Sequence, residues 1–223
     1  MPKNPPATAV TTETASTTAS AVRPLRVGIH GSSRQAERIV AAAGHAEARI
    51  SYVPYDVREP FRLLRAGELD VMLVKFGLRE PDIVTSGPVA YDARAVLVRA
   101  DHSLAGRASV SVEDITAYDA FRCPGDFPPY IWDLVVPPIT PLGGRIRRVL
   151  EMGSLAELAE TLAGSDSVHL SFRSLDGIVP SGIKVVPVTD LPAAPVSLAR
   201  LRHTTPSPEL TAFIAAAEKS VAR

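Results

Sequence analysis

Hydrophobic positions change their spacing repeatedly along the chain, and these changes predict secondary structure. An apolar run at 25–29 predicts a strand, and apolar residues at i, i+3, i+4 and i+7 from Ala36 predict an amphipathic helix that ends near Gly44. Strands that alternate with helices in this way are typical of βαβ units and a largely parallel sheet, so the predicted fold class is α/β. Further strands are predicted at 50–55, 69–76, 84–99, 120–123, 145–152, 168–172, 184–188 and 195–202, and further helices begin at Ser111, Pro129 and Ser207.

Two segments have the spacing of a helix capping box, in which a side chain at the helix start and one three residues later bind each other's backbone. Asp56 and Glu59 predict a helix directly after the second strand. Ser154 and Glu157 predict another helix, with an inward stripe of apolar residues at 155, 158, 159 and 162 and an end at Gly164.

The first 23 residues differ in composition from the rest of the chain. They are rich in Thr, Ala, Ser and Pro, and such a segment buries too little apolar surface to fold. We therefore expect a disordered tail at 1–23. This segment lacks the apolar run of a signal peptide, and no part of the sequence has the roughly 18 apolar residues that span a bilayer. We expect a cytoplasmic protein with no membrane partner.

Composition narrows the classes of function further. The 223 residues include 24 Lys and Arg against 24 Asp and Glu, so the chain lacks the positive charge on which non-specific nucleic-acid binding depends. The single cysteine, Cys123, excludes an intramolecular disulfide and a cysteine-based metal cluster. The sequence contains no metal-ligand spacing, phosphate loop or dinucleotide motif. We expect no nucleic-acid partner, no metal and no cofactor.

Several sequence segments follow one another in an informative order. They are LRVGI, LLRAGELDVMLV, VLVRADHSLAGRASVSVEDI, MGSLAELAETLAGSDSVHLSF, GIKVVPVTDLPAAPVSLARL and PELTAFIAA. This order, over about 25–221, resembles the effector-binding domain of LysR-type transcriptional regulators. The resemblance implies a type 2 periplasmic-binding-protein fold, in which two α/β lobes, each a mostly parallel sheet flanked by helices, enclose a ligand cleft. It implies lobe I at 24–95 plus 196–223 and lobe II at 96–195.

The chain also departs from that family. Regulators of this family carry an N-terminal winged helix-turn-helix and a long linker helix, whereas about 23 low-complexity residues precede the first predicted strand here. We therefore expect an effector domain that acts alone and does not bind DNA. The resemblance also implies a homodimer, paired side by side through the first helix and a helix of lobe II.

In doubly wound lobes, ligands bind at the carboxyl ends of strands and at the N-termini of the helices that follow. The resemblance implies that Ser32 and Ser33 match the effector-contacting hydroxyls of the family. Lys75, Arg122 and two histidines would form a cationic lining, which favours an acidic ligand. The rule selects His30, Gly31, Ser32, Ser33, Lys75, Phe76, Arg122, Cys123, Gly153, Ser154, His169, Ser171 and Phe172.

Several candidate residues are also open to a purely structural interpretation. Tyr130 and Trp132 would form a wall or lid with flat apolar area for a ring-containing ligand, or they would only pack in the core or in a dimer interface. The selected serines would serve as helix caps. Lys75 would be a solvated strand end, and Arg122 would pair with a nearby aspartate.

Three classes of function remain. The first is a protein that binds a small, acidic or ring-containing metabolite between its lobes. The second, which the resemblance allows, is an enzyme for a cyclisation, elimination or dehydration, with His30 and His169 as general acid and base because imidazole titrates near neutral pH. Cys123 is a weaker candidate, as a nucleophile, because no base is evident beside it. The third class is an interaction module that pairs with a full-length regulator.

Overall fold

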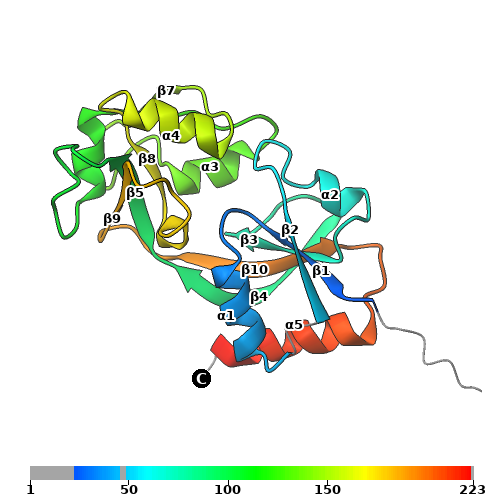
Figure 1. The fold of residues 1–223 in the computed structure, drawn as a ribbon. Helices are drawn as coiled ribbons and strands as arrows, with labels where there is room; N and C mark the ends of the chain where they lie inside the picture. Colours follow the sequence, from blue (N-terminus) through cyan, green and yellow to red (C-terminus); the bar gives the residue numbers. More distant parts are fainter. Residues whose placement is uncertain (1–22, 46–48, 222–223) are drawn as a thin grey trace, which may run out of the picture.

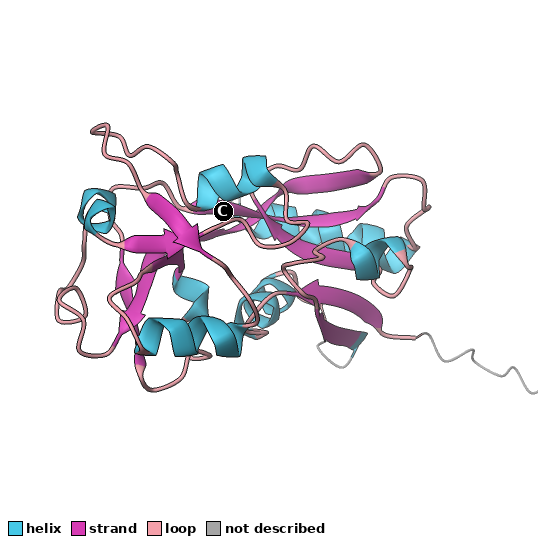
Figure 2. Cartoon of the chain, turned by 90° about the horizontal axis from the view of Figure 1, so that it is seen from above, coloured by secondary structure: helices cyan, strands magenta, loops and turns pink. Residues whose placement is uncertain are grey.

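The structure is a computed structural model and describes residues 23–45 and 49–221. Of the tail predicted at 1–23, all but Arg23 lies outside the described residues. Helices and strands are interspersed along the molecule (Figure 1; Figure 2), and no helix among the described residues is long and apolar enough to cross a membrane. The elements are β1 Leu25–Ile29, α1 Arg34–Ala42, β2 Ile50–Pro54, α2 Arg62–Arg65, β3 Val71–Lys75, β4 Ile83–Asp92, β5 Arg94–Arg99, η2 Val112–Ala117, β6 Asp119–Phe121, α3 Pro129–Val135, β7 Arg147–Leu150, α4 Leu155–Ala163, β8 His169–Phe172, η3 Arg173–Leu175, β9 Ile183–Pro187, β10 Ala194–Leu201 and α5 Pro208–Val221.

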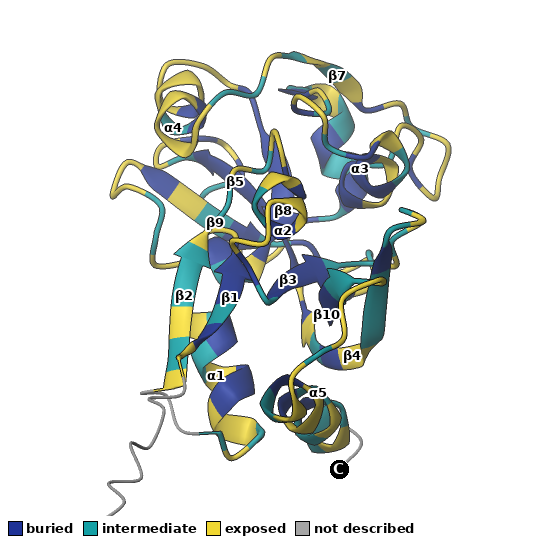
Figure 3. Ribbon diagram, turned by 90° about the vertical axis from the view of Figure 1, so that its right-hand side faces the viewer, coloured by how far each residue is buried: buried dark blue, intermediate teal, exposed yellow. Residues whose placement is uncertain are grey.

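Five strands form one sheet in the order β2-β1-β3-β10-β4, and we call this sheet with α1, α2 and α5 lobe I. β1 pairs in parallel with β2 and β3, whereas β10 pairs antiparallel with β3 and β4. α1 and α5 cover one face of the sheet, where Ile39 and Phe213 are buried, and α2 covers the other face (Figure 1; Figure 3). The apolar stripe predicted from Ala36 is therefore confirmed.

The remaining strands and helices form lobe II. β5 pairs antiparallel with β8 and β9, and β6 pairs in parallel with β7. The α/β fold class is confirmed, but the three-stranded sheet is antiparallel rather than mostly parallel. The first residues of β5 lie opposite the last residues of β8 and β9, with Arg94 opposite Phe172 and Ala95 opposite Pro187. β5 therefore runs antiparallel to both strands.

The chain passes between the lobes twice, from β4 into β5 and from β9 into β10. β4 and β10 lie side by side at this point, with Asp92 opposite Ala194. We call the place where these strands cross the joint. Lobe I and lobe II have separate hydrophobic cores on either side of it.

The two predicted capping boxes have different outcomes. The box at α4 is confirmed, because Ser154 Oγ accepts a hydrogen bond from Glu157 N–H at 3.2 Å and the Glu157 carboxylate accepts one from Ser154 N–H at 2.6 Å. The box at Asp56 is wrong. Asp56 accepts from Arg58 N–H at 2.8 Å, and this local turn competes with a helix. α2 begins only at Arg62.

The inward stripe predicted for α4 differs at its first residue. Leu158 and Leu162 are buried, but the Leu155 side chain is 41% exposed. Leu155 stands at the start of the helix and lines the cavity between the lobes, so it faces open space rather than the core of lobe II.

Candidate functional site

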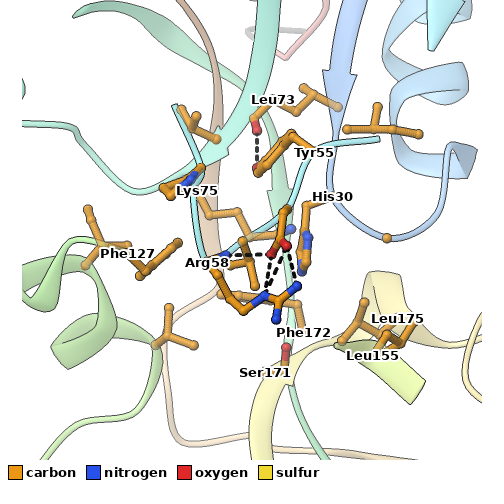
Figure 4. Close-up of a pocket in the computed structure, with 18 of the residues that line it drawn as sticks. His30, Tyr55, Arg58, Leu73, Lys75, Phe127, Leu155, Ser171, Phe172 and Leu175 are labelled. Carbon is orange, nitrogen blue, oxygen red and sulfur yellow. Dashed lines mark hydrogen bonds and ion pairs between the residues drawn. The ribbon is translucent and has the colours of Figure 1, made fainter. Parts of the chain in front are cut away.

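A cavity of about 460 Å³ lies between the lobes, and we call it the interlobe pocket (Figure 4). Lobe I contributes the ends of β1, β2 and β3, while lobe II contributes α3, the N-terminus of α4 and β8. Its walls are mostly apolar. Its volume is that of a pocket for a small metabolite, typically about 300–1,000 Å³. Among the described residues, no group of three His, Cys, Asp or Glu side chains could hold a metal ion.

The interlobe pocket brings together many of the site residues predicted from sequence. Those that line it are His30, Gly31, Ser32, Lys75, Trp132, Gly153, Ser154, His169, Ser171 and Phe172. The predicted residues that do not line it are Ser33, Phe76, Arg122, Cys123 and Tyr130.

Ser33 and Arg122 lie outside the lining, and each binds the carboxylate of another side chain. The Ser33 hydroxyl donates to the Glu37 carboxylate one turn further along α1. Arg122 is exposed and pairs with Glu151 at 2.9 Å. Arg122 therefore adds no positive charge to the walls of the interlobe pocket.

Two others belong to the packing around the pocket. Cys123 Sγ donates to the Phe127 carbonyl at 3.1 Å, and burial raises the pKa of the thiol, which disfavours a nucleophilic thiolate. Phe76 has a φ of 64°, and its ring centroid lies 6.2 Å from that of Phe172. Phe76 thus supports Phe172, which does line the pocket.

His30 faces the interlobe pocket from the end of β1 (Figure 4). Its ring centroid lies 5.7 Å from that of Tyr55, whose hydroxyl donates to the Leu73 carbonyl at 3.0 Å. The ring is open to the pocket, yet the pocket walls remove much of its hydration; this desolvation, and then the Lys75 ammonium, lower the pKa of His30 to about 4. His30 is therefore a neutral imidazole at pH 7.

His169 and Trp132 form the corresponding part of the wall in lobe II. Their ring planes are 26° from parallel with centroids 6.2 Å apart, and Phe121 meets His169 edge-on at 5.6 Å. Burial lowers the pKa of His169 to about 4, so this imidazole is also neutral at pH 7. His169 Nδ1 and Trp132 Nε1 are both buried without a hydrogen-bond partner.

Lys75 lies at the joint, at the end of β3. Its ammonium is 3.3 Å from the Asp92 carboxylate and 4.7 Å from the centre of the Phe172 ring. Asp92 is 4% exposed, so the ion pair is largely removed from water. Burial lowers the pKa of Lys75, and Asp92 opposes that shift. Lys75 is thus an internally paired cation rather than a solvated strand end.

Arg94 is a buried cation at the start of β5 that the sequence analysis did not select. Its guanidinium donates to the carbonyls of Ser171 at 3.3 Å, Leu134 at 3.0 Å and Val135. Burial lowers its pKa to about 10, which leaves it charged at pH 7. The last carbonyls of α3 are the negative end of that helix and compensate the charge. Arg94 therefore joins α3 and β8 to the joint.

The N-terminus of α4 forms another part of the pocket wall. Ser154 both caps the helix and lines the pocket, so its two interpretations are compatible. The Glu157 carboxylate turns back onto Ser154 N–H, and it fills the space beside Gly153 that a Cβ would occupy. A glycine is required at 153 for this reason.

Away from the joint, hydrogen bonds link the described residues of the two lobes at two places beside the pocket, and we call these the interlobe contacts. In the first, Asp126 N–H of lobe II donates to the Arg58 carbonyl of lobe I at 2.7 Å. In the second, the Tyr130 hydroxyl donates to the Glu80 carboxylate at 2.7 Å and accepts from Arg79 N–H at 2.6 Å. Tyr130 therefore connects the lobes from outside the pocket wall.

Some lining residues were missed by the sequence analysis. Tyr55, Asp56 and Arg58 follow β2 and line the pocket, and the rule that selected residues after β1 and β3 would have found them if applied to the second strand. Phe127 and Leu155 carry no such signal, because an apolar side chain in a loop or at a helix start does not reveal which cavity it faces.

Comparison with known proteins gives a consistent result. A family model described as LysR substrate binding domain matches residues 34–222. Full-length CbnR complexed with its target DNA has a TM-score of 0.68 at 17% identity, over 90% of this chain and 71% of CbnR. The effector binding domain of QuiR in complex with shikimate has a TM-score of 0.63 at 17% identity, over 88% of this chain and 95% of that domain.

A third structure has the same fold. The CcmR regulatory domain of Synechocystis PCC6803 in complex with 2-PG has a TM-score of 0.59 at 16% identity, over 89% of this chain and 97% of that domain. Identities this low show the fold alone. No curated protein matches the sequence. The two-lobed fold implied by the resemblance is confirmed.

Proposed function

The chain belongs to the LysR substrate-binding domain family, and on that premise we propose that it binds a small, ring-containing metabolite in the interlobe pocket. The observation that carries this proposal is the pocket itself, a cavity of about 460 Å³ whose mostly apolar walls come from both lobes. Domains of the same fold are described in complex with shikimate and with 2-PG. Of the acidic and ring-containing ligands expected from sequence, the apolar walls favour the ring.

The test is retention of a small molecule by the purified chain. The protein is incubated with a metabolite extract and passed through a gel-filtration column, and the compounds released on unfolding are identified by mass spectrometry. We expect a compound retained at no more than one molecule per chain and chemically unchanged.

Two leucine substitutions make a matched pair for this test. Leu155 is exposed and lines the pocket, so Leu155→Trp should fill the cavity and abolish retention. Leu142 is 84% exposed and does not line it, so Leu142→Trp should retain the compound. Equal retention by both variants, or no retained compound in the unaltered protein, would contradict the proposal.

An enzyme is the second candidate, because His30 and His169 line the same pocket from opposite lobes. Both are neutral at pH 7, so either is able to accept a proton from a bound substrate. Consumption of a metabolite far beyond the molar amount of protein would support this candidate. It should be lost in His30→Ala and in His169→Ala but kept in His203→Ala, whose side chain is exposed and outside the lining.

We further propose that the chain does not itself bind DNA, since its 24 basic and 24 acidic residues leave no net positive charge. Fluorescence anisotropy of a labelled duplex at low salt tests this, and saturable binding would contradict it. Homodimer formation, pairing with a full-length regulator and a cytoplasmic location stay predictions. Light scattering during gel filtration measures the first.

A further inference from the structure

We propose that the interlobe pocket takes an uncharged ring compound that carries a hydroxyl or carbonyl group, rather than a carboxylate or phosphate, and that Trp132 and His169 bind that polar group. This inference rests on the proposed function, because it names the ligand chemistry of the same site. It follows because the cations and helix N-termini at the pocket, which would otherwise attract an anion, are already bound to carboxylates or carbonyls of the protein, and the histidines of the lining are uncharged.

The cations in and around the pocket are paired within the protein. Lys75 is held by the buried Asp92 carboxylate at 3.3 Å. The Arg58 guanidinium binds both oxygens of Asp56, with its closest contact at 2.6 Å (Figure 4). Arg94 directs its guanidinium at backbone carbonyls and does not line the pocket. An anionic ligand would find no unpaired positive charge among these side chains.

The helix N-termini at the pocket also carry their own carboxylates. A free helix N-terminus attracts anions because its first N–H groups are unpaired. At α4, Glu157 accepts from Ser154 N–H at 2.6 Å, and this hydrogen bond lowers the pKa of Glu157 and keeps it charged. At α1, Glu37 lies in the first turn and binds the Ser33 hydroxyl. A ligand carboxylate would meet negative charge at both helices.

Neutral imidazoles remove the last expected source of positive charge. Desolvation lowers the pKa values of His30 and His169 far below 7. The lining therefore has mostly apolar walls and three charged side chains, of which Asp56 and Arg58 balance each other and Lys75 is balanced by Asp92, which lies behind the lining. Transfer of an unpaired anion into such surroundings is unfavourable, whereas an uncharged ring loses little hydration.

Trp132 and His169 show where a polar group of that ring would bind. They are 3% and 5% exposed and line the pocket, and Trp132 Nε1 and His169 Nδ1 are themselves covered and have no hydrogen-bond partner, so a ligand oxygen reaches them when these side chains shift on binding. Buried polar atoms are nearly always paired, so an unpaired pair at a cavity indicates a missing partner. The indole N–H only donates, and a neutral imidazole offers one donor and one acceptor. A hydroxyl or carbonyl oxygen of the ligand accepts from the indole, and a hydroxyl also donates to an imidazole nitrogen.

The test uses matched probes that differ in charge but hardly in shape: benzamide against benzoate, and 4-hydroxyacetophenone against 4-hydroxybenzoate. Trp132 is the only tryptophan, so ¹⁵N-labelled protein gives one indole N–H signal, and it reports on the pocket directly. At pH 7 we expect each neutral probe to bind at least tenfold more tightly than its carboxylate partner. We also expect the indole signal to move downfield as the N–H gains an acceptor.

Two variants separate the polar contact from the charge effect. Trp132→Phe keeps an aromatic ring but removes the N–H, and it should weaken the neutral probes roughly fivefold. Glu157→Gln keeps an acceptor for Ser154 N–H but removes a negative charge, and it should strengthen benzoate binding while leaving benzamide unchanged. His203→Gln is the control at an exposed histidine outside the pocket. It should change the binding of neither the neutral probes nor benzoate.

The outcomes distinguish this inference from the function on which it rests. Tighter binding of the neutral probes with a shifted indole signal supports both. Carboxylates that bind as well as or better than their neutral partners would overturn the inference and leave the binding function standing. If no probe at millimolar concentration shifts any signal of the pocket residues, both are wrong.

Discussion

Replacing Gly125 with alanine should open the interlobe pocket without unfolding either lobe. Gly125 has a φ of 47°, and a Cβ on it would lie 2.6 Å from the Arg58 carbonyl oxygen and 2.9 Å from Arg58 Cβ. Gly125 belongs to lobe II and Arg58 to lobe I. To regain an ordinary contact of 3.4 Å, the lobes must separate here by roughly 0.8 Å.

The size of the effect follows from where the collision occurs. An overpacked contact costs about 1–3 kcal/mol, and because this contact exists only when the lobes are closed, it lowers the ratio of closed to open molecules by roughly 5- to 150-fold. Gly143→Ala is the matched control. Gly143 also has a positive φ, 87°, but a Cβ there would meet nothing within 4 Å. It carries the backbone strain without the collision.

Acrylamide quenching of the single tryptophan measures the opening. Trp132 is 3% exposed in the closed structure, so quenching requires that the pocket open. Both variants should lower the melting temperature by about 2–4 °C, because alanine in a left-handed conformation costs about 1 kcal/mol. Only Gly125→Ala should also raise the quenching constant. Equal quenching constants for the two variants would refute the argument that this contact controls closure.

Three further predictions concern the polar groups at the lobe junction. Tyr130→Phe removes the hydroxyl that binds Glu80, so the free energy of unfolding should fall by about 1 kcal/mol and quenching should rise; unchanged quenching would mean that the lobes stay closed without it. Lys75→Met leaves Asp92 buried without its cation, so the free energy of unfolding measured in urea should fall by about 3–5 kcal/mol. The double variant that also carries Asp92→Leu should regain most of this stability, and no regain would contradict a role for the ion pair. Lowering the pH from 7 to 5 should cost about 2 kcal/mol of unfolding free energy through His169 alone, because His169, with a folded pKa of about 4 against 6.5 unfolded, stays neutral in the folded state while the unfolded chain gains a proton; His30 shifts in the same direction and adds to the loss. This stability is complete above pH 6.5 and is lost as the pH falls towards 4, and an equal slope in His169→Gln would exclude His169 as its source.

Features that depend on neighbours in sequence could be predicted from the sequence. The capping box of Ser154 and Glu157 closes within one helical turn, and the buried stripe that begins at Ala36 needs only the helical period. Even such local predictions fail where two local structures compete. At Asp56 a turn with Arg58 replaced the predicted helix start, and the sequence offered both arrangements.

Pairings between distant residues could not be predicted in the same way. Arg122 lies at a strand end, as a ligand-binding cation would, but β7 brings Glu151 beside it from 29 residues away. Tyr130 lies 50 residues from Glu80, and only the approach of the two lobes joins them. The rule that ligands bind at strand ends selected many residues that line the interlobe pocket, whereas the charge of that pocket depends on partners that no local pattern reveals.

The loops that form the pocket also hold the lobes together, and this couples binding to closure. Arg58 lines the pocket with its side chain and receives the hydrogen bond of Asp126 at its carbonyl. Gly31 lines the pocket too, and a Cβ there would press against Leu175 and Ile178 of lobe II at 3.0 Å. A ligand that contacts both walls favours the closed arrangement by the difference between its affinities for the closed and open states. Trp132 and His169 both belong to lobe II, so the preference for closure comes from the contacts that lobe I adds to a ligand already bound to them.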